Sequence, residues 1–271
     1  MKKIIPSTEQ GNNRDGLEFL SVKEILAFIH QEDQKITDAV ETIIPLLSAA
    51  VEQSLTHIKQ GGRVFYVGAG TSGRLGIVDA SEIPPTFGVE DLFIGIIAGG
   101  DKAIRKAVEF SEDDENQAWI DLSAYAPTKQ DIVVGITASG KTPYVLGALR
   151  TAREKGLLTI GITQNQESAI AAYSDFCLEI ITGPEFIRGS TRMKAGTAQK
   201  MTLNMFSTAI MVKLGKVKGE KMVDMRISNA KLLHRGAVMI MEETGLDFES
   251  AKILLQKTGS VRKAIESITP K

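Results

Sequence analysis

The sequence predicts an α/β fold: a doubly wound, mostly parallel sheet with N-terminal helices and a small C-terminal helical region. Two observations lead to this prediction. Short, continuously apolar segments alternate with helical segments, and turns rich in glycine or hydroxyl groups follow two of them. Strands without polar alternation are typical of parallel sheets that helices cover on both faces, because neither face meets water.

The N-terminal part of the chain is expected to be helical. Residues 21–33 form a periodic segment with Ser21 as its N-cap and Glu24 as the capping-box partner. From residue 36 to residue 58, apolar side chains recur at every third or fourth position. This spacing predicts one long amphipathic helix.

Five short apolar segments are the predicted strands. They lie at residues 63–68, 92–99, 131–136, 157–163 and 174–181. Between them, helices are expected at 75–80, at 102–110 and after the third strand, where a hydroxyl-rich turn opens a periodic segment.

The last third of the chain reads differently. The polar segment PEFIRGSTRMKAGTAQK, after residue 183, is expected to be a loop, and residues 202–215 an apolar helix. From residue 223 onward we expect helices only, with Asp247 and Ser260 as N-caps of the last two.

Composition and charge exclude several classes of protein. Lys and Arg total 32 and Asp and Glu 33, so a net charge of −1 offers no global field to hold nucleic acid or an anionic bilayer. No segment approaches the roughly 18 continuous apolar residues of a membrane span. The apolar stretch of the N-terminal tail stops at Pro6, unlike a signal peptide, and the single cysteine, Cys177, favours a reducing compartment. We therefore expect a cytoplasmic protein with a small anionic ligand.

Two loops carry the chemistry of the chain. Residues 68–73 read G-A-G-T-S-G between a predicted strand and helix, which is the context of a dinucleotide fingerprint. That fingerprint also needs an acidic residue after the second strand, where only Asp101 could serve. A second loop, T-A-S-G-K-T at 137–142, repeats hydroxyls and glycine before a helix.

The pair of loops favours a sugar phosphate over a dinucleotide. The free N–H groups at a helix N-terminus and the hydroxyls of Ser and Thr all donate to phosphate oxygens. Taken singly, each serine could instead be an ordinary N-cap, and Lys141 a solvated surface residue. The candidate binding residues are Gly70, Thr71, Ser72, Gly73, Ser139, Gly140, Lys141 and Thr142.

Three segments of the chain resemble a known family. GAGTSGRLGIVDASEIPPTFG at 68–88, GITASGKTPYVLGAL at 135–149 and GSTRMKAGTAQKMTLNM at 189–205 are similar to the N-acetylmuramic acid 6-phosphate etherases of the sugar isomerase (SIS) superfamily. DASEIPPTFG is the most specific part, since a generic phosphosugar isomerase would share only the serine loops. The resemblance spans nearly the whole chain.

The resemblance implies a domain organisation and a homodimer. A SIS domain would occupy 55–218, preceded by the tail and helices of 1–54 and followed by a C-terminal helical region at 219–271 that resembles a shortened ubiquitin-associated segment. The apolar helices expected at 36–58 and 202–215 exceed what one face of a small sheet can cover, so part of them is expected at the dimer interface.

The reaction that the resemblance implies is cleavage of the D-lactyl ether at C3 of N-acetylmuramic acid 6-phosphate. Elimination and addition of water would give N-acetylglucosamine 6-phosphate and D-lactate, a step of cell-wall amino-sugar catabolism and peptidoglycan recycling. In the open-chain sugar the C1 aldehyde acidifies the C2 proton, so a base can remove it while an acid protonates the departing oxygen. No cofactor is implied, and His30, His57 and His234 lack metal-ligand spacing.

The resemblance assigns the acid to Glu82 and the base to Glu112. Composition alone cannot select Glu112 from the acidic run at 112–115, in which Glu115 is the main alternative. Ser190, Arg192 and Lys194 are further binding candidates. The two cations could neutralise the phosphate or the lactyl carboxylate, or pair with acidic residues at a dimer surface. Glu185 has no assigned role.

Two other functional classes stay open. One is a non-catalytic sugar-phosphate sensor, because the glucokinase regulatory protein of the same superfamily resembles the etherases and acts by binding a partner enzyme. The other is a phosphosugar isomerase. The presence of both Glu82 and Glu112 favours chemistry over sensing, and DASEIPP favours the etherase over the isomerases.

Overall fold

The computed structural model describes residues 6–11 and 15–268 of the 271-residue chain. The start of the expected N-terminal tail, residues 1–5, lies outside the described residues. The chain divides into two compact units, one of residues 1–80 and 93–206, the other of residues 81–92 and 207–271. The domain boundaries expected at 54/55 and 218/219 stay predictions.

The first unit contains a five-stranded sheet in the order β2-β1-β3-β4-β5, with all neighbouring strands parallel. This confirms the predicted fold class, and each strand lies within its predicted segment. The strands are β1 (Val64–Gly68), β2 (Phe93–Ile97), β3 (Ile132–Ile136), β4 (Leu158–Thr163) and β5 (Phe176–Glu179). Strand β2 lies on one side of β1, whereas β3, β4 and β5 follow one another on its other side. The direction in which strands are added therefore reverses between β1 and β3. At the carboxyl end of this pair, Gly68 lies opposite Ile136.

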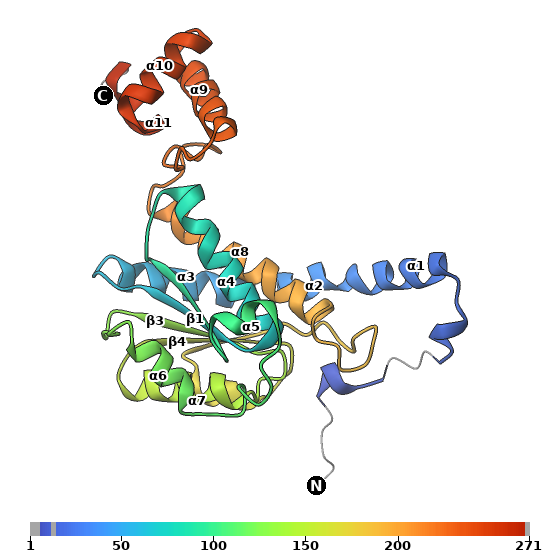
Figure 1. The fold of residues 1–271 in the computed structure, drawn as a ribbon. Helices are drawn as coiled ribbons and strands as arrows, with labels where there is room; N and C mark the ends of the chain where they lie inside the picture. Colours follow the sequence, from blue (N-terminus) through green and yellow to red (C-terminus); the bar gives the residue numbers. More distant parts are fainter. Residues whose placement is uncertain (1–5, 12–14, 269–271) are drawn as a thin grey trace. The chain divides into compact units, whose positions relative to one another are not determined.

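Helices cover both faces of the sheet, as Figure 1 shows. On one face, α6 (Gln117–Ser123) and α7 (Pro143–Glu154) pack with Phe65, Val67 and Val133 in one buried cluster, next to the short η3 (Ala169–Tyr173). On the other face lie α3 (Ile44–Ile58) and the first-unit parts of α4 (Gly70–Phe87) and α8 (Lys194–Lys213). The phenol of Tyr66 donates a hydrogen bond of 2.9 Å to Asp79 of α4 on this face.

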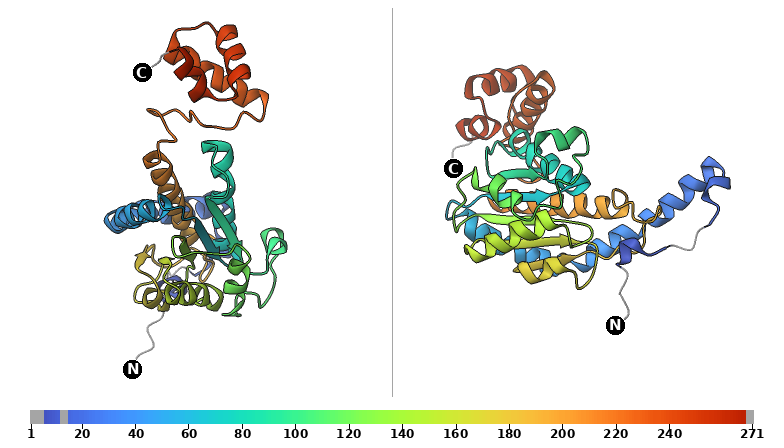
Figure 2. Two further views of the ribbon diagram at one scale, coloured as in Figure 1. Left: turned by 90° about the vertical axis from the view of Figure 1, so that its left-hand side faces the viewer. Right: turned by 60° about the horizontal axis from the view of Figure 1, so that its bottom comes forward.

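The N-terminal segment contains η1 (Ser7–Glu9), η2 (Leu17–Phe19), α1 (Val22–Asp33) and α2 (Lys35–Thr42). The predicted capping box is confirmed: the Ser21 side chain accepts from the N–H of Glu24, and the Glu24 carboxylate accepts from the N–H of Ser21 at 2.8 Å. Helix α1 projects away from the layers of the first unit (Figures 1 and 2).

The prediction of a single long helix from residue 36 to residue 58 is wrong. Two helices occupy this stretch, α2 and α3, with Ile43 between them. Proline lacks an N–H group and its ring clashes with the preceding turn, so it fits only in the first turn of a helix. Pro45 therefore marks the start of α3.

Other predicted helix boundaries also differ from the structure. Helix α4 begins at Gly70 instead of residue 75 and continues past residue 80, through Pro84 and Pro85, to Phe87. An added Cβ at Gly73 would lie 2.7 Å from the carbonyl oxygen of Gly68, so this glycine allows the helix to start directly on the strand. The helix expected at 102–110 shrinks to α5 (Asp101–Arg105), and Phe110 adopts a left-handed φ of 61° that a right-handed helix excludes. The acidic run at 112–115 lies in turns before α6.

The second unit is helical. Helices α9 (Ala230–Thr244), α10 (Phe248–Thr258) and α11 (Val261–Ile268) share a buried apolar cluster. Both predicted caps are confirmed, since Asp247 accepts from the N–H of Ser250 at 3.0 Å and Ser260 from the N–H of Lys263 at 3.4 Å. The helix expected from residue 223 begins only at Ala230. Among the described helices, none combines the length and apolar character needed to cross a bilayer.

Candidate active site

A cavity of about 260 Å³ opens at the carboxyl ends of β1 and β3. In a doubly wound sheet, ligands bind where the strand order reverses, because the loops that follow the two strands turn to opposite faces and leave a crevice. We call this space the hydroxyl-lined cavity. Its lining residues are Glu9, Ala69, Gly70, Thr71, Ser72, Glu112, Ile136, Thr137, Ala138, Ser139, Thr142, Gly189 and Thr191.

Three hydroxyls from the second loop form a connected cluster in this cavity. The hydroxyl of Thr137 lies 3.2 Å from that of Ser139 and 2.8 Å from that of Thr142. Between them, Gly140 has a φ of 68°, and an added Cβ would lie 2.1 Å from Oγ of Ser168. Only glycine therefore allows the turn that gathers these donors.

The first loop contributes a buried serine. Oγ of Ser72 donates to Oε1 of Gln199 at 2.9 Å, and the amide of Gln199 donates to Oε1 of Gln164 at 2.8 Å. Ser72 is in the first turn of α4, where backbone N–H groups have no partner within the helix. Together the two loops present hydroxyls and helix N-termini to the same space, which is an arrangement suited to an anion.

Glu112 lines the hydroxyl-lined cavity and also a neighbouring cavity of about 220 Å³. Its acidic neighbours have other partners: the Glu115 carboxylate accepts from Arg150 at 3.0 Å, and Asp114 accepts from the N–H groups of Asn116 and Gln117. Neither cavity includes Asp113, Asp114 or Glu115 in its lining. Within the acidic run, the base candidate Glu112 is thus the member that lines these two cavities, and its role as the base stays a prediction.

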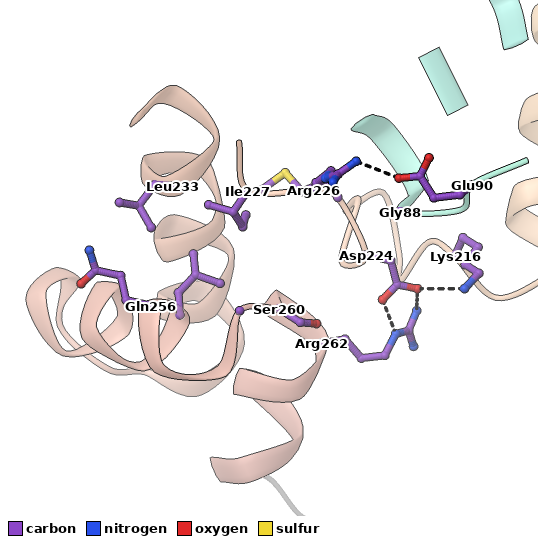
Figure 3. Close-up of a pocket in the computed structure, with 13 residues that line it drawn as sticks. Gly88, Glu90, Lys216, Asp224, Arg226, Ile227, Leu233, Gln256, Ser260 and Arg262 are labelled. Atoms are coloured by element: carbon purple, nitrogen blue, oxygen red, sulfur yellow. Dashed lines mark hydrogen bonds and ion pairs between the residues drawn. The ribbon is translucent and has the colours of Figure 1, made fainter. Parts of the chain in front are cut away.

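The second unit contains a larger cavity of about 930 Å³, shown in Figure 3. Its arginines are engaged by carboxylates: Arg262 donates to Asp224 at 2.7 and 2.9 Å, and Arg226 to Glu90 at 2.8 Å. Because these charges neutralise one another, the cavity is less suited to a small anion than the hydroxyl-lined cavity of the first unit.

Known proteins of one family match almost all of this chain. Identity is 52% over 268 residues to an N-acetylmuramic acid 6-phosphate etherase of Christiangramia forsetii, covering 98% of both chains. It is 54% to a protein of the same name from Bacteroides thetaiotaomicron, covering 98% of this chain and 96% of the relative. The chain belongs to the N-acetylmuramic acid 6-phosphate etherase family.

The other comparisons agree with the fold of the etherase family. A model of the glucokinase regulatory protein N-terminal SIS domain matches residues 46–153, and a model of the SIS domain matches residues 108–209. A phosphoheptose isomerase from Francisella tularensis is similar in structure, with a TM-score of 0.53 and 18% identity over 72% of this chain and 99% of the isomerase. One from Neisseria gonorrhoeae has a TM-score of 0.52 and 18% identity, over 69% and 97% of the two chains. At such identity, these two likenesses concern the fold alone.

In this etherase-family chain, the lining of the hydroxyl-lined cavity includes five of the candidate residues: Gly70, Thr71, Ser72, Ser139 and Thr142. Their neighbours Gly73, Gly140 and Lys141 are not in that lining, and Gly189 and Thr191 line it where Ser190 and Arg192 were candidates. Glu82 is exposed on α4 and belongs to the second unit. The binding and acid roles of these residues stay predictions.

Lys194 is buried and its ammonium is paired. The side chain is 1% exposed, and Nζ donates to Oε2 of Glu32 on α1 at 2.8 Å. Lys35 also donates to the Glu32 carboxylate, at 3.0 Å. The pair joins the end of α1 to the start of α8, and Lys194 is not in the lining of the hydroxyl-lined cavity.

Glu185, which had no assigned role, caps α8. Its two carboxylate oxygens accept the N–H groups of Lys194 and Ala195, each at 2.9 Å. These bonds start the helix at Lys194, so the loop expected over residues 184–200 ends earlier than predicted. Burial raises the pKa of the Glu185 carboxyl above its usual range, although the two backbone bonds oppose this shift.

Glu9 lines the hydroxyl-lined cavity, and sequence reasoning missed it. The amide of Asn165 donates to the hydroxyl of Thr8 at 3.0 Å, and Oγ of Ser7 donates to the carbonyl of Gln164 at 2.9 Å. These bonds hold η1 beside the loop after β4. An added Cβ at Gly189 would lie 3.2 Å from the Glu9 carboxylate. The bonds join residues 157 positions apart, so no local pattern could have revealed them.

Proposed function

We propose that this chain cleaves the D-lactyl ether of N-acetylmuramic acid 6-phosphate. The observation that carries the proposal is Glu112, a carboxylate in the lining of a cavity whose other walls are two hydroxyl-bearing loops at helix N-termini. The hydroxyls of Thr71, Ser72, Ser139 and Thr142 would hold the phosphate, which brings the sugar carbons to Glu112. Membership of the etherase family supports the same reaction.

The chemistry follows from the open-chain sugar. Glu112 takes the C2 proton, the C–H electron pair becomes the C2–C3 double bond, and the C3–O bond breaks toward the lactyl oxygen. We assign Glu82 of the segment DASEIPP as the acid that protonates this oxygen, as the resemblance to the etherases implies. Water then adds at C3 and a proton returns to C2, giving N-acetylglucosamine 6-phosphate and D-lactate.

The deciding experiment is incubation of the purified protein with N-acetylmuramic acid 6-phosphate and an enzymatic assay for D-lactate. We expect stoichiometric D-lactate together with N-acetylglucosamine 6-phosphate. Unphosphorylated N-acetylmuramic acid is the matched control and should give little product, because the phosphate is the group that the loops hold. Substrate binding without D-lactate would contradict the proposal and favour the sugar-phosphate sensor. Aldose–ketose interconversion of sugar phosphates would favour the isomerase.

We also propose that the chain is a homodimer. The apolar positions of the predicted stripe, such as Ile36, Leu47 and Leu55, are buried within the first unit. Exposed apolar side chains lie on the projecting N-terminal segment, with Phe19 85%, Val22 73% and Leu26 61% exposed, and also in the two stretches predicted for the interface, with Ile44 45%, Leu46 41% and Val212 47% exposed. A second copy would cover the exposed apolar patch of Phe19, Val22 and Leu26, because isologous contacts bury the same patch on both subunits.

Sedimentation at micromolar concentration tests the assembly. We expect a dimer for the parent protein and dissociation for Leu26→Glu, which places a charge in the exposed apolar patch on the N-terminal segment. Gln31→Glu, which adds the same charge at an exposed position on another face of α1, is the matched control and should stay dimeric. A monomeric parent protein would contradict the proposal.

The balanced charge and the single half-buried cysteine support a cytoplasmic location, where the enzyme would serve peptidoglycan recycling. Fractionation of the source cells checks this location. Recovery of the protein with a periplasmic or extracellular marker would contradict it.

A further inference from the structure

The second cavity beside Glu112 has a different chemistry from the first. It has a volume of about 220 Å³ and shares Ala69, Gly70 and Glu112 with the hydroxyl-lined cavity. Its further lining comes from the end of β2, from α5 and from the turns before the acidic run. We call it the alanine-lined cavity, because Ala69, Ala98, Ala103 and Ala107 are among its lining residues.

One cationic side chain, Arg74, lines the alanine-lined cavity. It lies early in α4, and its Nε donates to the carbonyl oxygen of Ile104 in α5 at 3.0 Å. This bond orients the guanidinium plane. In the described part of the chain, the two terminal amino groups of Arg74 have no hydrogen-bond acceptor. A guanidinium so fixed can bind a carboxylate through parallel N–H···O bonds.

The reaction needs a place for the lactyl group. That group is attached to C3, one carbon from the C2 atom that loses its proton, so it must lie close to Glu112 when the phosphate is held by the hydroxyls. It consists of a methyl group, which prefers an apolar wall, and a carboxylate, which needs a cation. The alanine-lined cavity borders Glu112 and offers both partners.

We propose that the alanine-lined cavity receives the lactyl group and that Arg74 binds its carboxylate. This inference rests on the proposed etherase function. The lactyl methyl packs on the alanine side chains, and the arginine holds the carboxylate until the C3–O bond has broken. Glu109 and Glu112 also line the cavity, and because both are exposed, water weakens their repulsion of the ligand. Arg74 thus sets specificity for lactyl-bearing sugars.

Arg74→Gln tests the inference through two ligands that differ only in the lactyl group. We expect kcat/KM for N-acetylmuramic acid 6-phosphate to fall about 10- to 100-fold, the usual worth of a charge-assisted hydrogen bond. The inhibition constant of N-acetylglucosamine 6-phosphate, which lacks the lactyl group, should change less than about twofold. Arg74→Lys keeps the positive charge but lacks the paired N–H donors of the guanidinium group, so it should recover part of the lost kcat/KM. Arg105→Gln, an exposed arginine on α5, is the matched control and should leave both constants unchanged.

The remaining outcomes overturn the inference in distinguishable ways. Equal losses for both ligands would show that Arg74 acts on the phosphate or on the fold. Unchanged constants in an active Arg74→Gln variant would show that the lactyl carboxylate binds elsewhere. If the parent protein releases no D-lactate, the proposed function itself fails, and the lactyl assignment fails with it. Thermal unfolding of each variant separates loss of fold from loss of binding.

Discussion

The backbone N–H of Tyr144 donates a hydrogen bond of 3.0 Å to the carbonyl oxygen of Glu112. Tyr144 lies in the first turn of α7, directly after the hydroxyl loop that ends at Thr142. The bond therefore joins the turn that carries the carboxylate to the loop that carries the hydroxyls. The ion pair between Glu115 and Arg150 is a second link between this acidic run and α7.

Glu112→Gln should abolish catalysis at its first step. The amide has the same shape but cannot accept a proton at neutral pH, so both D-lactate release and exchange of the C2 proton with solvent deuterium should fall about 10²- to 10⁴-fold. NMR of the substrate in deuterium oxide measures the exchange. Glu115→Gln is the matched control, since its carboxylate pairs with Arg150, and it should keep nearly full activity. The reverse result for these two variants would mean that the base is Glu115.

Glu82→Gln should separate the two steps. An acid that protonates only the leaving oxygen is not needed for enolisation, so this variant should lose D-lactate release about 10²- to 10⁴-fold and retain measurable C2 exchange. Glu90→Gln changes another exposed carboxylate, three residues after the end of α4, and serves as the control that should keep D-lactate release. Loss of exchange with retained fold would reverse the two roles, and full activity would remove Glu82 from the mechanism.

Ser139→Asp should abolish binding of sugar phosphates. The new carboxylate would stand where phosphate oxygens are expected, and like charges at close range repel. Ser72→Asp should have the same effect, although this serine is buried and its variant also needs a check of folding. Calorimetric titration with N-acetylglucosamine 6-phosphate measures the affinity. Ser123→Asp, on an exposed position of α6, should bind like the parent protein. Unchanged affinity in Ser139→Asp would refute the phosphate assignment of this loop.

Lys194→Met should destabilise the protein, because it takes the Lys194 ammonium away from the buried Glu32 carboxylate, which Lys35 contacts from the surface. Removal of one partner of a buried ion pair costs about 3 kcal/mol. The double variant Glu32→Leu/Lys194→Met should be more stable than Lys194→Met, since no charge then stays buried. Denaturant unfolding measures both. If Lys194→Met instead keeps its stability and loses affinity for sugar phosphates, Lys194 binds the ligand.

Asp131→Asn should remove part of the acid sensitivity of the fold. Burial alone would raise the pKa of Asp131, but bonds from Arg63 and from the backbone N–H groups of Thr128 and Arg63 lower it below its usual range. The stabilisation is therefore present above the unfolded pKa of about 3.9 and lost as the pH falls through the lower folded pKa. We expect the variant to be less stable by roughly 2 kcal/mol at pH 7, with a difference that shrinks below about pH 4. If the difference in unfolding free energy between the variant and the parent protein does not change with pH, the charge of the Asp131 carboxylate does not contribute to stability.

Local patterns predicted those features whose cause is local. The five strands follow from short apolar runs, and the capping box of Ser21 and Glu24 from their spacing. The break at Ile43 had a local signal as well, in Pro45, which we read as part of a continuous helix. The start of α4 at Gly70 also had a local signal, in the G-x-G-x-x-G spacing that ends at Gly73, but we placed the start of the helix five residues later.

The sequence by itself determined the parallel sheet, the two hydroxyl loops and the family, because apolar periodicity, glycine positions and motif segments are all written within short stretches of chain. Only the tertiary structure decided that Glu112 and not Glu115 lines the cavities, that Lys194 pairs with Glu32, and that Glu9 and Arg74 line the walls. The physical reason is distance along the chain. The Lys194–Glu32 bond spans 162 positions, and contacts of this range depend on how whole layers pack.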